Sequence, residues 1–192
     1  MRKSRLENLI DSIFAFSMTL LVLTVAIPTS ATLGSSDLAV ENILSQLTPD
    51  LIHYVIAFLI LAGFWIMHHH YFEHIHFVDQ KILWLNILAL VFVTLIPFST
   101  NFSQTFVDFP LAAIVLEFNI LMIGLIFCIQ WLHATKIDKL LKEELGHKQY
   151  FLVSKRLLII PLFSIIAIFI ALLGFTWSPL IYAIMPIVYL RL

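Results

Sequence analysis

Ionisable side chains stand inside stretches of this sequence that are otherwise apolar. Asp11 lies near the start of the first apolar run, and Glu117 lies in the middle of a later one. Five histidines occur within residues 68–76. Carboxylates and imidazoles at such positions relay protons, bind metal ions or hold helices together through hydrogen bonds. For Glu117 the sequence alone leaves two roles open, a step on a transport pathway or a packed hydrogen bond.

The histidine cluster is the feature that a metal site would use. His70 and His74 stand four residues apart, a spacing that lets two imidazoles on one helix chelate a divalent ion. Metal-transporting helices usually add carboxylates at the middle of the membrane, whereas the acid beside this cluster is Glu73, at the boundary. Histidine at a membrane boundary commonly serves as an amphipathic anchor. We therefore predict no metal site.

Asp11 requires a partner, because an unpaired carboxylate inside an apolar helix costs several kcal/mol. The polar side chains expected at the same level, at the ends of neighbouring apolar runs, are His68, His69 and Asn86. Together with Arg5, these residues form a predicted hydrogen-bonded network that fixes the first helix to the next two. A proton or metal site built from the same groups is the alternative.

Composition identifies the medium around these residues. The chain of 192 residues is 61% hydrophobic and only 12% charged, and its mean hydropathy is +1.00. Soluble domains contain about 25% charged residues, so most of this apolar surface must face a lipid bilayer. A net charge of -1 offers no field for nucleic acid, and no nucleic-acid partner is expected.

Motifs of membrane-embedded or soluble enzymes are not present in the sequence. It contains no HExxH motif, no phosphate-binding glycine-rich loop and no nucleophile paired with a base. We therefore predict that the protein is not an enzyme, that it has no catalytic residues and that it requires no cofactor.

The apolar runs predict an all-α fold, a bundle of six transmembrane helices in a single domain covering residues 1–192. A helix needs about 20 residues to cross a hydrocarbon core of about 30 Å. Proline stands at the starts of the second, fourth and sixth runs, where its missing N–H costs nothing. The last run is short and contains Pro186. The helices are predicted at about residues 6–27, 49–72, 80–97, 110–134, 151–174 and 179–190.

Positive charge predicts how the helices are oriented in the membrane. All eleven Lys and Arg residues lie on one side of the apolar runs, and the connections at 29–48, 99–109 and 174–178 contain none. Short loops that carry Lys and Arg stay in the cytoplasm during insertion. The sequence therefore predicts a multi-pass protein with six crossings and both termini cytoplasmic.

Four stretches of the sequence together resemble one known family. They are RLENLIDSIFAFSMTLLVL, FWIMHHHYFEHI, LWLNILALVFVTLIPFST and a fourth helix with a central acidic residue. They are similar to the prokaryotic homologues of transmembrane protein 175, the endosomal and lysosomal potassium channel. The family's first helix carries Arg, three residues and then Phe-Ser-Asp. This sequence keeps Arg5 and Asp11 but has Leu9 and Ile10 in place of Phe-Ser.

Three further patterns of the family are intact. They are Trp65-x-x-His68-His69-x-x-Phe72, the Leu85-Asn86 pair and the Pro97-Phe98-x-Thr100 ending of the third helix. The resemblance implies a homotetramer in a prokaryotic cell membrane, with a central pore lined by the first helix of each subunit. It implies a potassium-permeable cation channel, modestly selective for K⁺ over Na⁺, with Na⁺, Cs⁺ and H⁺ as the other permeant candidates. The TVGYG filter of ordinary potassium channels is absent from the sequence.

The resemblance also implies which residues form the constriction. The family's apolar positions on the first helix correspond here to Phe16, to Thr19 or Leu20, and to Leu23. Their spacing places them on one helix face, although residues so spaced could equally face lipid or the core. Phe16 is bulkier than the Ile or Leu usual in the family. Its ring could narrow the neck or attract a cation to its face.

One other class of function also fits the residues. A proton-coupled or metal-ion transporter would use Asp11, Glu117 and the cluster between His68 and His76 as relay groups. Saturable flux driven by pH would distinguish it from a channel, which passes ohmic current.

Overall fold

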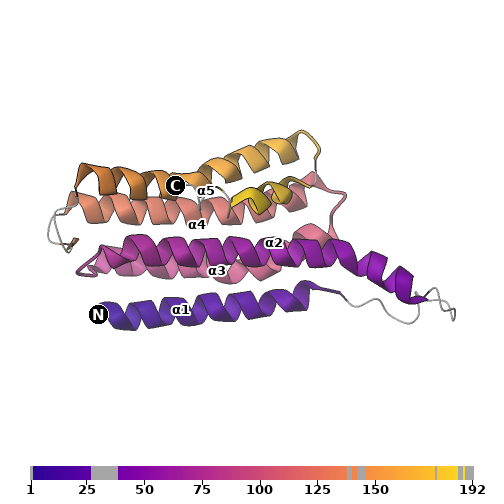
Figure 1. Cartoon of the computed structure of the whole chain (residues 1–192), viewed down its shortest axis with the longest axis horizontal. Helices are drawn as coiled ribbons and strands as arrows, with labels where there is room; N and C mark the ends of the chain where they lie inside the picture. Colours follow the sequence, from indigo (N-terminus) through magenta and orange to yellow (C-terminus); the bar gives the residue numbers. More distant parts are fainter. Residues whose placement is uncertain are drawn as a thin grey trace.

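Long parallel helices make up the protein in its computed structural model, which describes residues 2–26, 39–137, 140–141, 146–175, 177–185 and 188. The five long helices lie side by side along the longest axis of the molecule (Figure 1). The elements are α1 (Lys3–Leu20), the 3₁₀ helix η1 (Leu21–Thr24), α2 (Ala39–Glu73), α3 (Gln80–Thr105), α4 (Pro110–Lys136), α5 (His147–Leu172) and the 3₁₀ helix η4 (Ser178–Ile184). The prediction of an all-α fold is confirmed.

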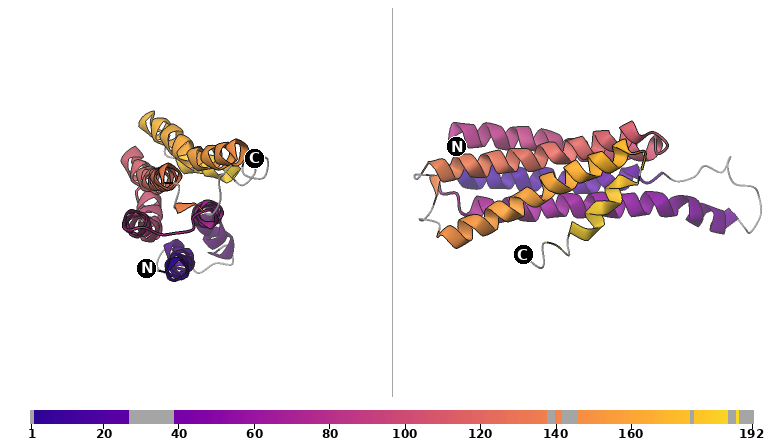
Figure 2. Two further views of the ribbon diagram at one scale, coloured as in Figure 1. Left: turned by 90° about the vertical axis from the view of Figure 1, so that its left-hand side faces the viewer. Right: turned by 90° about the horizontal axis from the view of Figure 1, so that it is seen from above.

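Five described segments are long and apolar enough to cross a membrane. They are Lys3–Thr24, Ile43–Glu73, Gln80–Thr105, Pro110–Lys136 and His147–Leu172. Seen along the bundle, α1 lies on one side and α5 on the opposite side, with α2, α3 and α4 between them (Figures 1 and 2). This order places the first helix at an edge of the subunit.

Two helices extend past the prolines that were expected to bound them. α2 begins at Ala39 instead of Pro49, and α3 continues to Thr105 instead of ending at Pro97. An internal proline removes one backbone hydrogen bond, but side-chain contacts and neighbouring helices can hold such a helix together in a membrane. Next to Pro97, the Ser99 hydroxyl donates to the Leu95 carbonyl at 3.0 Å.

The sixth predicted helix is described only in part. Ser178–Ile184 forms a 3₁₀ helix instead of the predicted α-helix. At about 2 Å per residue, its seven residues extend about 14 Å, less than half of a hydrocarbon core of about 30 Å. The remainder of the predicted helix, at residues 186–187 and 189–190, lies outside the described residues, as do residue 27 of the first predicted helix and Arg191.

The tightest helix packing occurs between α4 and α5. A Cβ atom added to Gly124 of α4 would lie 2.9 Å from Cδ of Pro161 on α5. Real Cβ contacts are almost never this short, so only glycine fits without displacing the proline ring. This close approach fixes α5 against α4 along their middle turns.

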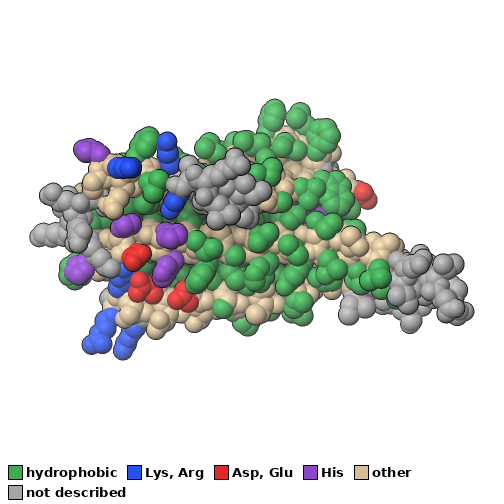
Figure 3. Space-filling view, in the orientation of Figure 1, with side chains coloured by type: hydrophobic (Ala, Val, Ile, Leu, Met, Phe, Trp, Pro, Cys, Tyr) green, Lys and Arg blue, Asp and Glu red, His purple; other side chains and the backbone are tan. Residues whose placement is uncertain are grey.

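Charged and histidine side chains gather at one end of the bundle, whereas apolar side chains cover most of the remaining described surface in the same view (Figure 3). This end, which we call the charged end, contains the start of α1 and the ends of α2 and α4. The two connections there are joined by a contact between residues 75–76 and 140–141, since the His76 N–H donates to the Leu140 carbonyl at 2.6 Å.

Candidate functional site

The first helix has two distinct faces. One face is buried against α2 and α3 and carries Leu6, Ile10, Phe14 and Ser17. Leu21 of η1 continues it and is fully buried. These residues recur every three or four positions, as expected for one side of a helix. The packing therefore leaves the opposite side of α1 uncovered within the subunit.

That uncovered side carries three of the four predicted constriction residues. Phe16 is 61% exposed and Leu23 is 74% exposed, and Thr19 is exposed between them. Leu20 is only half-buried and lies at the margin, where it helps to line a cavity with Pro97 and Phe98 of α3. Between the two positions considered in the sequence, Thr19 shares the face of Phe16 and Leu23.

The exposed face of α1 alternates between polar and apolar side chains. Ser12 and Thr19 are seven residues apart, and Leu9, Phe16 and Leu23 repeat with the same period. Both hydroxyls donate to carbonyls of their own helix at 2.7 Å, Ser12 to Asn8 and Thr19 to Phe16. Their oxygen lone pairs remain available as acceptors on the exposed side. Ser12 was missed in the sequence, although its spacing of seven from Thr19 could have identified it.

Asp11 has a different partner from those predicted. Its Oδ1 accepts a hydrogen bond from the Trp65 indole Nε1–H at 2.8 Å. Trp65 in turn stacks on His69, with ring centroids 6.2 Å apart. The sequence gives Trp65 only as part of a family pattern, because its apolar ring drew no attention as a hydrogen-bond donor. Asp11 thus joins α1 to the middle of α2.

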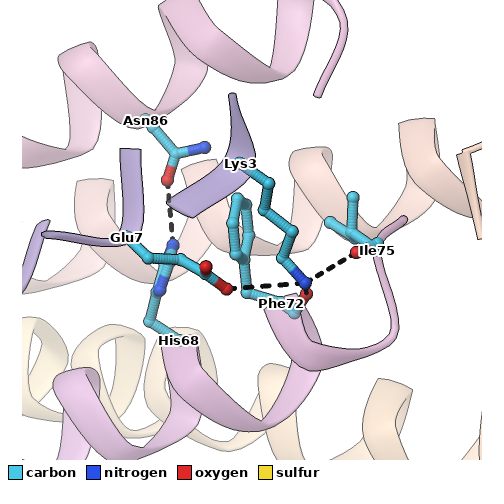
Figure 4. Close-up of polar contacts among 6 residues, drawn as sticks. All are labelled: Lys3, Glu7, His68, Phe72, Ile75 and Asn86. Carbon is cyan, nitrogen blue, oxygen red and sulfur yellow. Dashed lines mark hydrogen bonds and ion pairs between the residues drawn. The ribbon is translucent and has the colours of Figure 1, made fainter. Parts of the chain in front are cut away.

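His68 and Asn86 form a separate buried pair. His68 Nε2 lies 2.9 Å from Asn86 Oδ1, and the Asn86 amide donates to the Ile82 carbonyl at 2.8 Å. The His68 ring also stacks on Phe72 at 4.7 Å. Both residues point toward one another between α2 and α3 (Figure 4). The predicted five-residue network is therefore divided into two pairs, Asp11–Trp65 and His68–Asn86.

A cavity of about 240 Å³ connects the two pairs. Its walls include Glu7, Asp11, Trp65, His68 and His69. Three of the five predicted network residues therefore meet at one small space beside the start of α1, although they are not joined by one continuous chain of hydrogen bonds.

The predicted role of Arg5 belongs to Lys3 instead. Lys3 Nζ donates to the carbonyls of Phe72 and Ile75 at 2.8 and 2.7 Å, and it forms an ion pair with Glu7 at 3.5 Å (Figure 4). A cation at the last carbonyls of a helix is stabilised by the helix dipole. Arg5 is exposed, and its guanidinium has no polar partner among the described residues. Which of two neighbouring cations reaches α2 depends on the rotation of α1, which spacing alone does not specify.

Glu117 lies in a packed cluster in the second half of the chain. Its side chain is fully buried, and its two oxygens accept hydrogen bonds from Ser178 at 3.1 Å and from the Tyr182 hydroxyl. The Tyr182 oxygen also lies 3.0 Å from Ser164 Oγ. This carboxyl therefore joins α4, α5 and η4, and the geometry corresponds to a packed hydrogen bond.

The remaining histidines of residues 68–76 do not converge. His70 and His74 line a groove between α2 and α5, and His76 packs edge-on against Phe77. Within the described parts of the chain, no group of three or more His, Cys, Asp or Glu residues is placed to hold a metal ion.

Asp79 links α3 and α4 at the charged end. Its Oδ1 accepts from the Ile82 N–H at 2.8 Å and caps α3, and its Oδ2 lies 2.7 Å from His133 Nε2. Partial burial acts to raise the pKa of Asp79, but the hydrogen bonds from Ile82 and His133 outweigh it and hold the pKa below its ordinary value. The pair fixes the connection between α2 and α3 against the end of α4.

Comparison with known proteins relates this arrangement to one family of channels. Residues 5–97, which contain α1 and the contacts around Asp11 and His68, match the family model of the endosomal/lysosomal potassium channel TMEM175. The chain is 29% identical to a potassium channel of Chamaesiphon minutus over 155 residues, which are 79% of this chain and 75% of that protein. It is 32% identical to a potassium channel of a Chryseobacterium species over 105 residues, 55% of this chain and 50% of the other.

A solved structure has the same fold. The crystal structure of a lysosomal potassium-selective channel TMEM175 homolog from Chamaesiphon minutus superposes with a TM-score of 0.82. The match covers 98% of this chain and 96% of that one, at 22% sequence identity.

Proposed function

Because the chain belongs to the family of the endosomal/lysosomal potassium channel TMEM175, we propose that it forms a potassium-permeable cation channel whose constriction is made by α1. The family is one of ion channels and not of enzymes. The observation that supports this assignment most is the uncovered face of α1, which carries Phe16, Thr19 and Leu23 while the rest of the helix is packed. A helix at the edge of a subunit with one free face is suited to line a path between subunits.

One subunit cannot enclose an ion path with a single helix face. Four copies arranged around an axis would turn their α1 faces toward one another and stack rings of Phe16, Thr19 and Leu23. From Phe16 to Leu23 the rise along the helix is about 10 Å at 1.5 Å per residue. We therefore propose a homotetramer with a short neck. Native mass spectrometry in detergent should show four subunits, and a strictly monomeric or dimeric species that still conducts would contradict the pore.

Apolar rings of this kind control ions through water. A narrow apolar neck expels water, and an ion cannot shed its hydration without replacement ligands. K⁺ gives up water more easily than Na⁺, and the Thr19 hydroxyl oxygens would replace part of the lost water. This chemistry favours K⁺ over Na⁺ modestly, and Na⁺, Cs⁺ and H⁺ remain candidates for slower permeation.

We further propose that the charged end lies in the cytoplasm of a prokaryotic cell and that the chain crosses the membrane six times. The gathering of Lys and Arg at this end supports the orientation (Figure 3). An even number of crossings places both termini there. A reporter fused at each terminus should then be cytoplasmic.

The contacts at the charged end are proposed to set the rotation of α1. Lys3 holds the start of α1 to the end of α2, and Asp11 holds its third turn through Trp65. Two attachments along one helix fix which face remains free. In this account Arg5, Asp11, His68, His69 and Asn86 act in assembly and do not contact the permeant ion at the neck.

The experiment that tests the function is current across a planar bilayer that contains the purified protein, with K⁺ and Na⁺ on opposite sides. The proposal predicts an ohmic current with a reversal potential that favours K⁺. Absence of conductance, or a reversal potential of zero, would contradict a potassium channel. A proton-coupled or metal-ion transporter using Asp11, Glu117 and residues 68–76 would instead give saturable flux driven by pH, and the packed position of Glu117 disfavours it.

A further inference from the structure

A groove of about 550 Å³ lies between α2 and α5, away from the free face of α1. Its floor is formed by the buried side chains of Met67, Tyr71, Leu157 and Met185. The volume falls in the range of about 300–1,000 Å³ that is typical of sites for small molecules. The constriction and the contacts of Asp11 make no use of this space.

The groove opens on the flank of the bundle. Three residues at its rim are exposed, Leu59 by 40%, Ile66 by 48% and Leu152 by 39%. Gly63 leaves the middle open, because a Cβ atom added there would meet nothing within 4 Å. A molecule could therefore enter from the side, at a level that faces the hydrocarbon of the bilayer.

The two ends of the groove differ in polarity. From Leu59 to His74 the wall of α2 is about 22 Å long at 1.5 Å per residue, and its inner part is apolar. The polar lining residues lie toward the charged end and are His70, Glu73, His74, Gln149 and Arg156. This gradient matches a ligand with an apolar tail and a polar head.

Arg156 specifies the charge of that head. It lies in the third turn of α5, inside a segment long and apolar enough to span the membrane, where a cation is costly and usually serves a function. Lys155 is its neighbour in sequence, and Lys148 stands at the start of the same helix. Glu73 is the acid in the groove lining, so its mouth favours an anion. Basic pockets between transmembrane helices commonly bind anionic lipid head groups, and a guanidinium binds phosphate with paired hydrogen bonds.

We propose that the groove binds an anionic phospholipid from the leaflet at the charged end, with one acyl chain along Gly63 and Ile66 and the phosphate at Arg156. A water-soluble anion would have no use for the apolar length of the groove. The site requires only that the helices span a bilayer and does not depend on ion conduction. Bound lipid would hold α2 and α5 together on the flank opposite to the floor.

The test uses the full-length protein in nanodiscs and two photoactivatable lipids, phosphatidylglycerol and phosphatidylcholine, each with a diazirine in one acyl chain. Mass spectrometry of the digested protein locates the labelled residues. The proposal predicts labelling by phosphatidylglycerol within residues 59–67 and 152–157. Labelling by phosphatidylcholine should be several-fold weaker, and inorganic phosphate should not compete.

Two variants and two matched controls make the test decisive. Arg156→Gln should reduce phosphatidylglycerol labelling about fivefold, as the loss of one cation near a lipid head group implies. Gly63→Leu should block labelling by filling the groove, and it introduces no clash that would impair folding. Lys81→Gln removes an exposed cation elsewhere, and Ala183→Leu enlarges an exposed residue outside the groove; both should label like the parent protein. Equal labelling by the two lipids, unchanged labelling of Gly63→Leu, or cross-links that show a second subunit seated in the groove would each overturn the proposal.

Discussion

The two halves of the chain are held together in different ways. In α1, α2 and α3, the polar contacts lie near the charged end and connect single side chains across neighbouring helices, as in Asp11–Trp65 and Lys3–Phe72. In α4, α5 and η4, the main polar cluster is fully buried around Glu117, and Gly124 lets α4 and α5 approach closely. Of an 18-residue apolar stretch in α1, 28% is buried, whereas the corresponding share for α4 is 56%.

This difference separates the tasks of the two halves. The family model matches residues 5–97, the half that leaves a helix face uncovered. The second half buries its polar groups and supports α2 and α3 from the other side. We therefore expect changes in α4, α5 or η4 to reduce stability without altering ion preference, and changes on the free face of α1 to do the opposite.

The largest loss of stability is expected from Glu117→Ala. This change leaves the hydroxyls of Ser178 and Tyr182 without their acceptor and opens a cavity, at a cost of about 3 kcal/mol. Thermal unfolding in detergent should show a clear fall in Tm, while any protein that still reconstitutes should keep the parent K⁺/Na⁺ permeability ratio. Asp108→Ala, at an exposed carboxylate, is the control and should shift stability by at most about 0.5 kcal/mol. A stable Glu117→Ala variant with altered selectivity would place Glu117 on the ion path.

A second test of the supporting half is Gly124→Ala. The new methyl group would press on the Pro161 ring, which cannot move aside by rotation, so α4 and α5 must separate at a cost of about 1–2 kcal/mol. Gly63→Ala is the matched control, because nothing lies within 4 Å of a Cβ atom there and alanine favours a helix over glycine. The melting temperature should fall for the first variant and stay level or rise for the second. Equal shifts in both would mean that the close α4–α5 approach is not tightly packed.

The sequence predicted the helices better than their ends and partners. Long apolar runs and one-sided Lys and Arg residues led to the all-α bundle, since a membrane leaves few other solutions. The starts and ends at Pro49 and Pro97 were wrong, because proline ends a helix only where nothing else supports it. The free face of α1 followed from the period of Phe16, Thr19 and Leu23 together with the family resemblance.

The polar partners required the relative rotation and height of the helices. Trp65 and not His68 reaches Asp11, and Lys3 and not Arg5 reaches α2. A shift of one residue along a helix turns a side chain by about 100°, and no local pattern records how far α1 is turned against α2. The groove at Arg156 likewise depends on how far α2 and α5 stand apart.

A smaller effect is expected from Asp11→Asn in the first half. The hydrogen bond from Trp65 then ends on a neutral amide instead of a carboxylate, which should cost about 1 kcal/mol or less at this exposed site. Trp65→Phe should cost a similar amount, and the double variant should cost no more than Trp65→Phe alone. Thermal unfolding and tetramer yield measure the loss. Loss of pH-dependent flux with intact assembly would instead identify Asp11 as a proton relay.

The smallest effect concerns pH. Because the pKa of Asp79 is lowered in the folded protein, its contribution to stability is complete above its unfolded pKa of about 3.9 and is lost as pH falls through the lower folded value. The melting temperature of the parent protein should therefore decline below about pH 4 more steeply than that of Asp79→Asn. Near neutral pH the variant should be slightly less stable, by at most about 1 kcal/mol. Parallel curves at acidic pH would show that the contact with His133 contributes nothing to stability.

The central claim is that the free face of α1 forms the ion constriction. Bilayer recordings of Phe16→Ala and Leu23→Asn, compared with Ile13→Ala on a half-buried side of the same helix, test it most directly. We predict larger currents and a lower K⁺/Na⁺ permeability ratio for the first two, since a wider or wetter neck demands less dehydration, and parent values for Ile13→Ala. Parent current and selectivity in both Phe16→Ala and Leu23→Asn would show that α1 is not the filter.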